Sequence, residues 1–417
     1  MNSEIRYQYQ QRNGGMGSKT FCSLPWKHLA THPHGAVTLC CESDHTNRIS
    51  ESFDSGDFKR EFKTLHTTEY DFDAIQNSDS FSIVRKQMLA GEEPAPCTRC
   101  FDFERVGIKS KRQLDNERLN FTEEEAIRVT NADGSINSVD YEFIELRLGN
   151  ICNVACRTCN PFSTSRWVKD WNEVNPENPQ TIDQNMFNWP TDQNFWDKLI
   201  QHCDSLRIVY INGGEPLLID KHMSFLQDLI DRDVAKNITL VYSTNCTIVN
   251  HEYEEIWKKF KHVQLMLSID ALGALNHFIR HPTKWAKVLE TINWVKVLSE
   301  FDNISYNIMC TVSIYNIWYL KEFHEFFKEV PYISLNFVTD PEYQDASRLP
   351  EAIKLAVLKK YVGCSFYDTI EQYLGQKESV NDLTEFMQKT LKMDELRKNN
   401  FSQTFPELYD LVTPYVR

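Results

Sequence analysis

The chain has 417 residues, of which 41% are hydrophobic and 12% aromatic, and its formal net charge at pH 7 is −14. This length and apolar content suffice for a large core and more than one domain. The negative charge argues against nonspecific binding to a nucleic acid backbone. No apolar run approaches the ~20 residues of a membrane span, and the first twenty residues lack the apolar core of a signal peptide. We expect a cytoplasmic protein that does not bind membranes, with two domains and a tail.

The N-terminal region begins with a segment that predicts a β-hairpin. Its two strands are expected at 26–31 and 36–39, with a turn at Pro33-His34-Gly35 between them. Such a hairpin would bring Cys22 toward Cys40 at its open end. Cys41 competes with Cys40, but neighbouring side chains of a strand point to opposite faces, so only one of the two should face a given metal. We choose Cys40.

A second pair of thiols, Cys97 and Cys100, follows a predicted helix at 81–89. Their C-x2-C spacing suits two ligands of one metal. Twelve cysteines in a chain of this size also favour metal ligands over a disulfide framework. With Cys22 and Cys40, the pair makes a set of four thiolates. The same set would suit a zinc ribbon, because spacing alone does not separate zinc from an iron–sulfur cluster.

After a linker at 121–140 that is dense in turn-forming residues, short β-rich segments alternate with helical ones. The predicted strands are 142–149, 206–212, 238–243, 263–269, 304–312 and 332–338. The predicted helices between them are 193–203, 219–231, 252–260, 283–299 and 316–329. Six such units imply parallel strands joined by helical crossovers, which is an α/β fold. The count falls short of the eight units of a closed barrel.

The first of these strands leads into Cys152, Cys156 and Cys159, which have the spacing C-x3-C-x2-C. We call residues 152–159 the cysteine loop. Three thiolates can hold a cubane of four irons and leave one iron open to another ligand. A structural zinc site would need a fourth ligand close by, and no Cys or His lies between Cys159 and His202.

Three polar motifs follow at the carboxyl ends of the next strands. They are Gly213-Gly214-Glu215-Pro216, Ser243-Thr244-Asn245 and Ser268-Ile269-Asp270. Barrels of this class gather their chemistry at that end of the strands. The glycines let bare backbone approach a ligand, and the polar side chains can bond charged groups and hydroxyls. Taken alone, each motif is also an ordinary turn or helix cap.

In the cysteine loop and these three motifs the sequence resembles the radical S-adenosylmethionine (SAM) superfamily. The resemblance implies a partial (β/α)6 barrel at 141–340, with a [4Fe–4S] cluster on the three loop cysteines and SAM at its open iron. Arg280, in the segment HFIRHP, would pair with the SAM carboxylate, a task that suits the guanidinium fork. A surface ion pair is its alternative. The SAM-binding residues implied are Gly213, Gly214, Glu215, Ser243, Asn245, Ser268, Asp270 and Arg280.

The four N-terminal thiols resemble the auxiliary Twitch or SPASM cluster fold, here in a permuted position before the cysteine loop. The resemblance implies a second, auxiliary [4Fe–4S] cluster held by Cys22, Cys40, Cys97 and Cys100. The expected organisation is therefore a flexible lead at 1–20, an auxiliary iron–sulfur domain at 21–120, the linker, the partial barrel and a helical C-terminal extension at 341–417.

The resemblance implies an oxidoreductase, similar to maturases, that reductively cleaves SAM to a 5′-deoxyadenosyl radical and abstracts hydrogen from a peptide or small metabolite. A cluster with four thiolates has no open iron, which favours electron transfer at the auxiliary site. A reductant such as flavodoxin or ferredoxin would supply the electron. The competing hypothesis is a non-catalytic iron–sulfur or zinc-binding protein, which has no use for polar motifs on successive strand ends.

Overall fold

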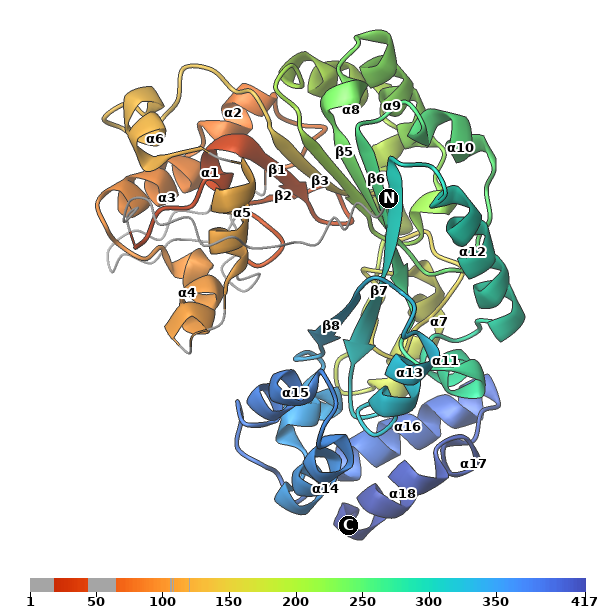
Figure 1. Cartoon of the computed structure of the whole chain (residues 1–417). Coiled ribbons are helices and arrows are strands. Elements are labelled where there is room, and N and C mark those ends of the chain that lie inside the picture. Colours follow the sequence, from red (N-terminus) through yellow and green to blue (C-terminus); the bar gives the residue numbers. More distant parts are fainter. Residues whose placement is uncertain (1–18, 44–64, 106, 108, 120) are drawn as a thin grey trace. The chain divides into compact units, whose positions relative to one another are not determined.

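The computed structural model describes residues 19–43, 65–105, 107, 109–119 and 121–417 (Figure 1). Most of the expected flexible lead at 1–20 lies outside the described residues. The chain divides into two compact units. Unit 1 comprises 1–28, 38–65 and 71–139, and unit 2 comprises 29–37, 66–70 and 140–417. Each unit is described by itself below.

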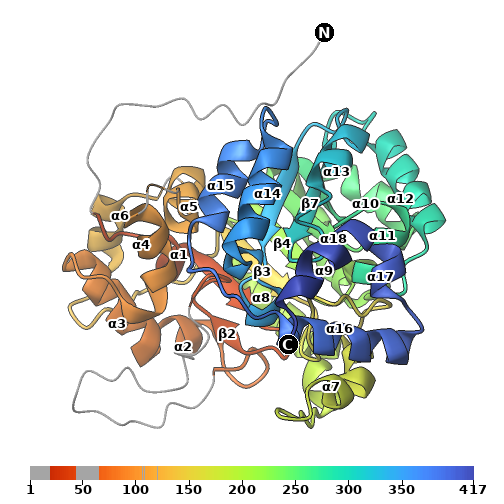
Figure 2. The same ribbon diagram turned by 90° about the horizontal axis from the view of Figure 1, so that it is seen from below.

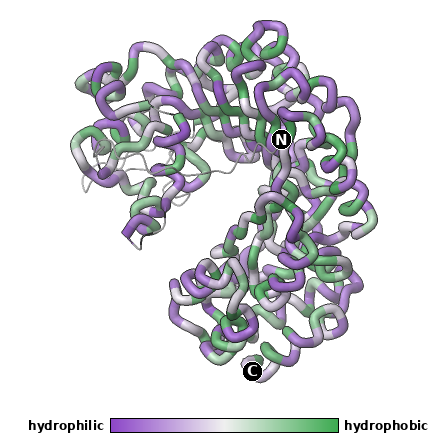
Figure 3. The backbone as a smooth tube through the Cα atoms, in the orientation of Figure 1, coloured by the Kyte–Doolittle hydropathy of each residue, from purple (hydrophilic) through white to green (hydrophobic). Residues whose placement is uncertain are grey.

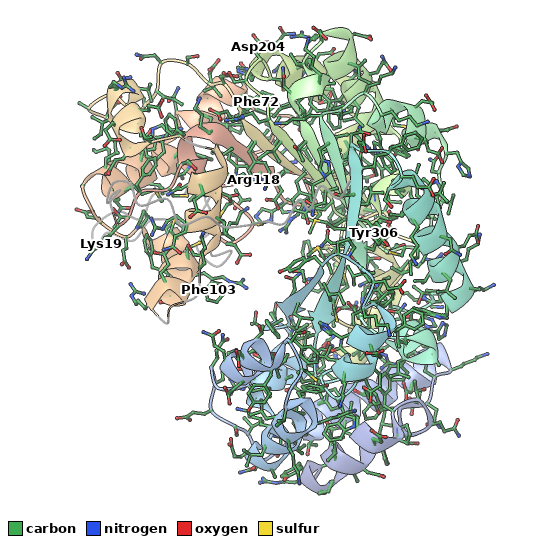
Figure 4. The ribbon with its side chains drawn as sticks, in the orientation of Figure 1. Lys19, Phe72, Phe103, Arg118, Asp204 and Tyr306 are labelled. Atoms are coloured by element: carbon green, nitrogen blue, oxygen red, sulfur yellow. The ribbon has the colours of Figure 1, made fainter. Side chains whose placement is uncertain are left out.

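The described part of unit 1 is helical. Its helices are α1 Leu24–Lys27, α2 Phe72–Gln76, α3 Asp79–Leu89, η1 Ala95–Cys97, α4 Thr98–Arg105, α5 Lys111–Leu119 and α6 Glu123–Val129. Figure 4 labels Phe72 in α2 and Phe103 in α4. The centre of the unit is the fully buried Arg85, whose guanidinium donates to the carbonyls of Pro25 and Gln76. These bonds tie α3 to α1 and to the end of α2.

Two local predictions for unit 1 need revision. Trp26 and Lys27, predicted to begin a strand, lie in α1, because Pro25 favours a helix start and the Trp26 indole donates to the Thr130 hydroxyl. The segment predicted as a linker, 121–140, contains α6. Thr122 and Glu125 form a capping box at its start, a signal that the turn-forming residues beyond it obscured.

Unit 2 is built on a sheet with the order β2-β1-β3-β4-β5-β6-β7-β8. All six predicted strands are present as β3 Phe143–Arg147, β4 Ile208–Asn212, β5 Thr239–Thr244, β6 His262–Ser268, β7 Ile304–Val312 and β8 Ile333–Phe337, and neighbours pair in parallel. The remaining strands, β1 His28–Thr31 and β2 Val37–Thr38, form the hairpin. The α/β fold is therefore confirmed, as a mostly parallel sheet consistent with a barrel of the TIM type.

The hairpin, expected in the N-terminal domain, extends this sheet beside β3. The Arg147 backbone N–H donates to the Thr31 hydroxyl, and the Trp189 indole donates to the Pro33 carbonyl. Gly35 in its turn has φ +85°, and a Cβ there would lie within 2.8 Å of atoms of His66 and Trp189. The turn therefore needs glycine for both its conformation and the space around it.

The two faces of the sheet have different character. Along β6, Val263, Leu265 and Leu267 are buried, whereas Gln264 and Ser268 on the other face are half-buried. Helices cover the apolar face, and α9, α10 and α12 flank the strands in Figure 1. The flanking helices are α8 Gln193–Leu199, α9 Lys221–Asp231, α10 Glu252–Trp257, α11 Gly273–Ile279, α12 Trp285–Leu298 and α13 Leu320–Phe326. Figure 3 shows apolar and polar residues interspersed along the backbone.

The remaining elements of unit 2 come from the segment after the cysteine loop and from the C-terminal extension. The first contributes η2 Ser165–Trp167, α7 Val168–Val174, η3 Gln184–Phe187 and η4 Trp189–Thr191; η5 Ile200–His202, η6 Pro216–Leu218 and η7 Ala235–Asn237 lie between the strands. The extension forms η8 Glu342–Gln344, η9 Ala346–Arg348, α14 Glu351–Tyr361, α15 Tyr367–Leu374, α16 Thr384–Arg397, α17 Phe401–Thr404, α18 Pro406–Val412 and η10 Thr413–Tyr415. Helix α16 lies beside α7 (Figure 2). Among the described residues, no helix has the length and apolarity to cross a membrane.

A buried histidine makes the core of unit 2 sensitive to acid. Burial lowers the pKa of His222 to about 4, and its Nε2 bonds the Tyr242 hydroxyl. The unfolded chain binds the proton near pH 6.5, so stability is complete above that pH and falls as the pH drops toward 4. Between pH 7.5 and 5 this histidine should cost about 2 kcal/mol of unfolding free energy. Urea unfolding at both pH values should show a smaller difference for His222→Phe than for the unchanged protein, and equal differences would contradict this assignment.

Candidate functional site

One cavity of about 120 Å³ is lined by most of the residues that the sequence singled out in unit 2. The three loop cysteines line it together with residues from the ends of β4, β5 and β6. Residues between strands and from the end of α11 complete the wall. The lining residues are Cys152, Val154, Cys156, Cys159, Ser163, Thr164, Gly213, Gly214, Ser243, Thr244, Asn245, Ser268 and Arg280. The convergence follows from the parallel sheet, because consecutive strands end at the same edge.

The two glycines are required by close backbone packing. Gly213 has φ +83°, and a Cβ there would lie 2.8 Å from the backbone of Arg147 at the end of β3. Gly214 has φ +52°, and its Cβ would lie 2.1 Å from the carbonyl oxygen of Ile151. The next backbone N–H, of Glu215, donates to that same oxygen at 2.8 Å. The GGE segment therefore fixes the entry to the cysteine loop.

Glu215 lies behind the cavity wall. Its side chain is fully buried, one carboxylate oxygen accepts from the Thr244 hydroxyl and the Leu217 N–H, and the other accepts from the Asn245 N–H at 2.6 Å. Burial raises the pKa of this carboxyl to about 7, although the three donors act in the opposite direction. These three donors fix the orientation of the Glu215 carboxylate against the end of β5, and the contact with SAM that the resemblance implied stays a prediction.

The other polar residues of β5 and β6 meet the cavity directly. The Ser243 hydroxyl bonds the Tyr210 hydroxyl at 2.7 Å, and Ser268 lines the wall from the end of β6. Asn245 donates through its amide to Asn153 Oδ1 at 2.8 Å and lies 3.6 Å from the Cys152 Sγ. Its side chain therefore links the end of β5 to the first residues of the cysteine loop.

Asp270 and Arg280 form a buried ion pair. Arg280 Nη1 donates to Asp270 Oδ2 at 2.9 Å, and Asp270 Oδ1 accepts from the Thr311 N–H. Asp270 is fully buried and, like Glu215, is not part of the cavity wall. The Arg280 Nε is buried without an acceptor among the described residues. The surface ion pair considered for Arg280 is thus wrong, because the residue is only 9% exposed and lines the cavity.

The thiols of the cysteine loop are held in an apolar setting beside this cation. Burial raises the pKa of all three, that of Cys159 to about 11, whereas Arg280 acts in the opposite direction on each. Within the described residues, no group of three His, Cys, Asp or Glu side chains is arranged to hold a single metal ion. A cubane binds each thiolate through a different iron, so it needs wider spacing than one ion does. The donor set of three thiols and a buried arginine fits such a cluster.

In unit 1 the thiol of Cys22 lies within electrostatic range of the thiols of Cys40, Cys97 and Cys100. Burial raises the pKa of each, with that of Cys97 at about 12, and the thiols of Cys97 and Cys100 add to the effect on Cys22. Cys40 is influenced by Cys22 and Cys97 as well as by its neighbour Cys41. The four residues thus come from the segment before α1, the segment after β2, and the η1 and α4 helices.

Sequence reasoning missed several residues around the cysteine loop. Ser163 and Thr164 line the cavity, and only their position after the third cysteine could have indicated this. Arg157 forms a buried ion pair with Asp394 of α16, and no local sequence pattern predicts this pair. Cys203 and Cys310, which the sequence left unassigned, are buried and do not line the cavity.

Three cysteines, a double glycine and a buried arginine thus lie together at the carboxyl ends of the strands of an α/β sheet. Residues 146–327 match the family model described as the Radical SAM superfamily, so this segment is a radical SAM superfamily domain. The superfamily consists of enzymes that use a [4Fe–4S] cluster and SAM. This supports the iron–sulfur and SAM assignments for that domain.

Among solved structures, the chain is similar to native anSMEcpe with bound AdoMet, at 17% identity over 57% of this chain and 62% of that one, with a TM-score of 0.36. It is also similar to Streptococcus suis SuiB bound to S-adenosylmethionine, at 13% identity over 72% of this chain and 65% of that one, with a TM-score of 0.35. The chain thus spans less than two thirds of either protein. No curated protein matches it.

Proposed function

We propose that this protein reductively cleaves SAM and uses the 5′-deoxyadenosyl radical to abstract hydrogen from a peptide or small metabolite. The observation that carries the proposal is the single cavity lined by three cysteine thiols and the buried Arg280, whose Nε lacks an acceptor among the described residues. A bound [4Fe–4S] cluster would supply the electron that splits the sulfonium of SAM, and its open iron would hold the amino acid end of SAM.

In this proposal, each residue of the site binds the cluster, binds SAM or positions a neighbouring residue. Cys152, Cys156 and Cys159 bind the cluster. Arg280, fixed by Asp270, offers its unpaired N–H to the SAM carboxylate, for which a charge-assisted bond is suited. The cavity-lining Ser243, Asn245 and Ser268 can bond the remaining polar groups of SAM, and the double glycine keeps the wall free of side chains. Glu215 and Asp270 act as positioning residues.

An auxiliary [4Fe–4S] cluster on Cys22, Cys40, Cys97 and Cys100 is the second part of the proposal. The mutual influence of these thiols on their pKa values supports one shared site, and the four-thiolate set favours electron transfer over substrate binding. The alternative is a zinc-binding or non-catalytic iron–sulfur protein, and zinc is the less favoured of the two because the described thiols are not arranged to hold a single ion. Loss of an electron from the substrate radical to this cluster would make the net reaction an oxidation, as in an oxidoreductase or maturase.

The polar face of the sheet, which carries Gln264 and Ser268 of β6, favours a polar substrate. This face carries Tyr210, Gln264 and Asn307. The Tyr210 hydroxyl bonds the Ser243 hydroxyl at 2.7 Å, and the Gln264 amide donates to Asn307 Oδ1 at 3.2 Å. Groups of this kind suit the amides of a peptide or the hydroxyls of a metabolite. A cytoplasmic location, and flavodoxin or ferredoxin as the electron donor, are parts of the same proposal.

Anaerobic reconstitution tests the reaction. The purified chain is loaded with iron and sulfide, then given dithionite and SAM, and 5′-deoxyadenosine and methionine are measured by liquid chromatography. Dithionite supplies the one electron that each cleavage consumes, and without substrate the 5′-deoxyadenosyl radical takes its hydrogen atom from the protein or buffer. Each cleavage therefore yields one methionine and one 5′-deoxyadenosine, so equal amounts of both products are expected. A protein that binds iron and sulfide at the loop cysteines yet forms no 5′-deoxyadenosine would favour the non-catalytic alternative.

The auxiliary site gives a prediction that separates two adjacent cysteines. Cys40→Ala should lower the iron content and visible absorbance after reconstitution, because the Cys40 thiol interacts with Cys22 and Cys97. Cys41→Ala, the matched control, should keep both, because alternate side chains of an extended segment point to opposite sides. Iron is counted on both single variants. Loss of iron in Cys41→Ala with retention of iron in Cys40→Ala would reverse the assignment. Zinc without iron at this site, in protein purified anaerobically, would exclude a role in electron transfer.

A further inference from the structure

Side chains from distant elements bind the backbone of the cysteine loop. The carbonyl of Val154 accepts from the Thr164 hydroxyl, and that of Cys156 accepts from the Trp167 indole at 2.7 Å. The carbonyl of Ala155 accepts from Arg397 Nη1 at 2.9 Å, at the end of α16. The carbonyls of Val154, Ala155 and Cys156 thus all accept from side chains outside the loop, which restrains the backbone that carries the Cys156 thiol.

Arg157, inside the loop, is anchored to the same helix. Its Nη2 donates to Asp394 Oδ1 at 2.6 Å, and its Nη1 donates to the Thr390 carbonyl. The guanidinium also lies over the Phe278 ring at 3.6 Å from the ring centre. Arg157 is 1% exposed, so these contacts replace all of its hydration. Asp394 in turn accepts from the Phe401 N–H, which ties the helix to α17.

Arg397 is the second cation behind the loop. Besides the Ala155 carbonyl, it contacts Asp170 Oδ2 at 3.2 Å and lies over the Trp167 ring at 4.4 Å. Met393, one turn earlier, is buried in the same apolar cluster as Ala155 and Trp167, and Cys159 packs against that cluster. Helix α16 therefore meets the loop through both apolar and charged contacts.

We propose that α16 is a brace for the cysteine loop, and that its Arg397, together with Arg157, sets the reduction potential of the cluster held by Cys152, Cys156 and Cys159. The inference rests on the proposed function, because it assumes that cluster. Its residues are positioning residues, since neither arginine lines the cavity.

The physical reason is the charge that reduction adds. A one-electron reduction makes the cluster more negative, and nearby cations in a poorly hydrated region stabilise that state. Arg397 is 8% exposed and Arg157 is 1% exposed, so water screens their charges little. Removing one of these charges should shift the midpoint potential to a more negative value. A rigid loop should also retain its iron longer.

The test is a potentiometric titration of the reconstituted protein, followed by electron paramagnetic resonance of the reduced cluster. A triple alanine variant of Cys22, Cys97 and Cys100 simplifies the signal. In that background, Arg397→Met should lower the ratio of reduced to oxidised cluster by roughly tenfold at a fixed potential. This corresponds to a midpoint potential that is about 59 mV more negative for one electron. Arg397→Lys, which keeps the charge, should remain near the unchanged value. Lys392→Met is the matched control, because Lys392 lies on the same helix with a side chain 41% exposed, and it should produce no shift.

A second variant tests the brace while both Arg157 and Arg397 keep their positive charges. Asp394→Asn removes the carboxylate that anchors Arg157, and it should speed the loss of iron to a chelator severalfold while the circular dichroism spectrum stays that of the folded protein. An unchanged potential in Arg397→Met together with unchanged iron loss in Asp394→Asn would overturn the inference. The proposed function would survive that result, since it fails only if the reconstituted protein does not cleave SAM.

Discussion

Single replacement of Cys152, Cys156 or Cys159 by alanine is expected to abolish SAM cleavage. Each thiol binds a different iron of the proposed cubane, so loss of one leaves two ligands and a labile cluster. About half of the iron should remain, because the auxiliary cluster has its own four ligands. The measurements are iron and sulfide per chain and 5′-deoxyadenosine formed with dithionite. Cys364→Ala offers a matched control, because Cys364 is a half-buried thiol that lies outside both sites, and it should keep full activity.

The three variants also test the ligand set residue by residue. Full cleavage in any one of them would remove that cysteine from the assignment. Complete loss of iron in all three would count against an independent cluster in unit 1, because its ligands are unchanged. The two proposed sites can therefore fail separately.

Gly214→Ala should be among the most destabilising single substitutions in the chain. Its left-handed backbone alone costs an alanine about 1 to 2 kcal/mol. The added Cβ would also lie 2.1 Å from the Ile151 carbonyl oxygen, which accepts the Glu215 N–H, so the strand end or the loop entry must shift. We expect a total loss of at least ~3 kcal/mol in unfolding free energy, measured by urea unfolding, together with loss of the reconstituted cluster.

Gly363→Ala separates the two contributions. Gly363 also has a positive φ, +84°, but no atom lies within 4 Å of the position of its Cβ. That variant should lose only the conformational part, about 1 kcal/mol, and keep its cluster. Equal losses in both variants would show that close packing against Ile151 contributes nothing.

The strands of unit 2 were predictable from sequence because each is a short apolar segment bounded by turn residues. Predicted strand 304–312 has the same bounds as β7 Ile304–Val312, and the others differ by at most two residues at either end. Parallel order then placed the motifs that follow β4, β5 and β6 at one edge. Helix α11 escaped notice, since its short segment Gly273–Ile279 lies in a run of mixed residues before the stronger pattern of α12.

Which motif residues face the cavity could not be predicted. Glu215 and Asp270 have the polarity of ligand-binding residues, yet backbone N–H groups and hydroxyls of neighbouring strands occupy their oxygens. The sequence shows that a carboxylate can accept hydrogen bonds. Which N–H or hydroxyl groups donate to it depends on the register of β5 and β7. The same holds for Arg157, whose partner Asp394 is 237 residues away.

That separation has a consequence for the order of events during synthesis. A ribosome that adds about 5 to 20 residues per second completes α16 roughly 10 to 50 seconds after the cysteine loop. During this interval Arg157 lacks its carboxylate, and the Ala155 carbonyl lacks the Arg397 donor. The loop therefore lacks these two contacts until α16 has been made, and a cluster inserted before that time would meet a loop without the proposed brace.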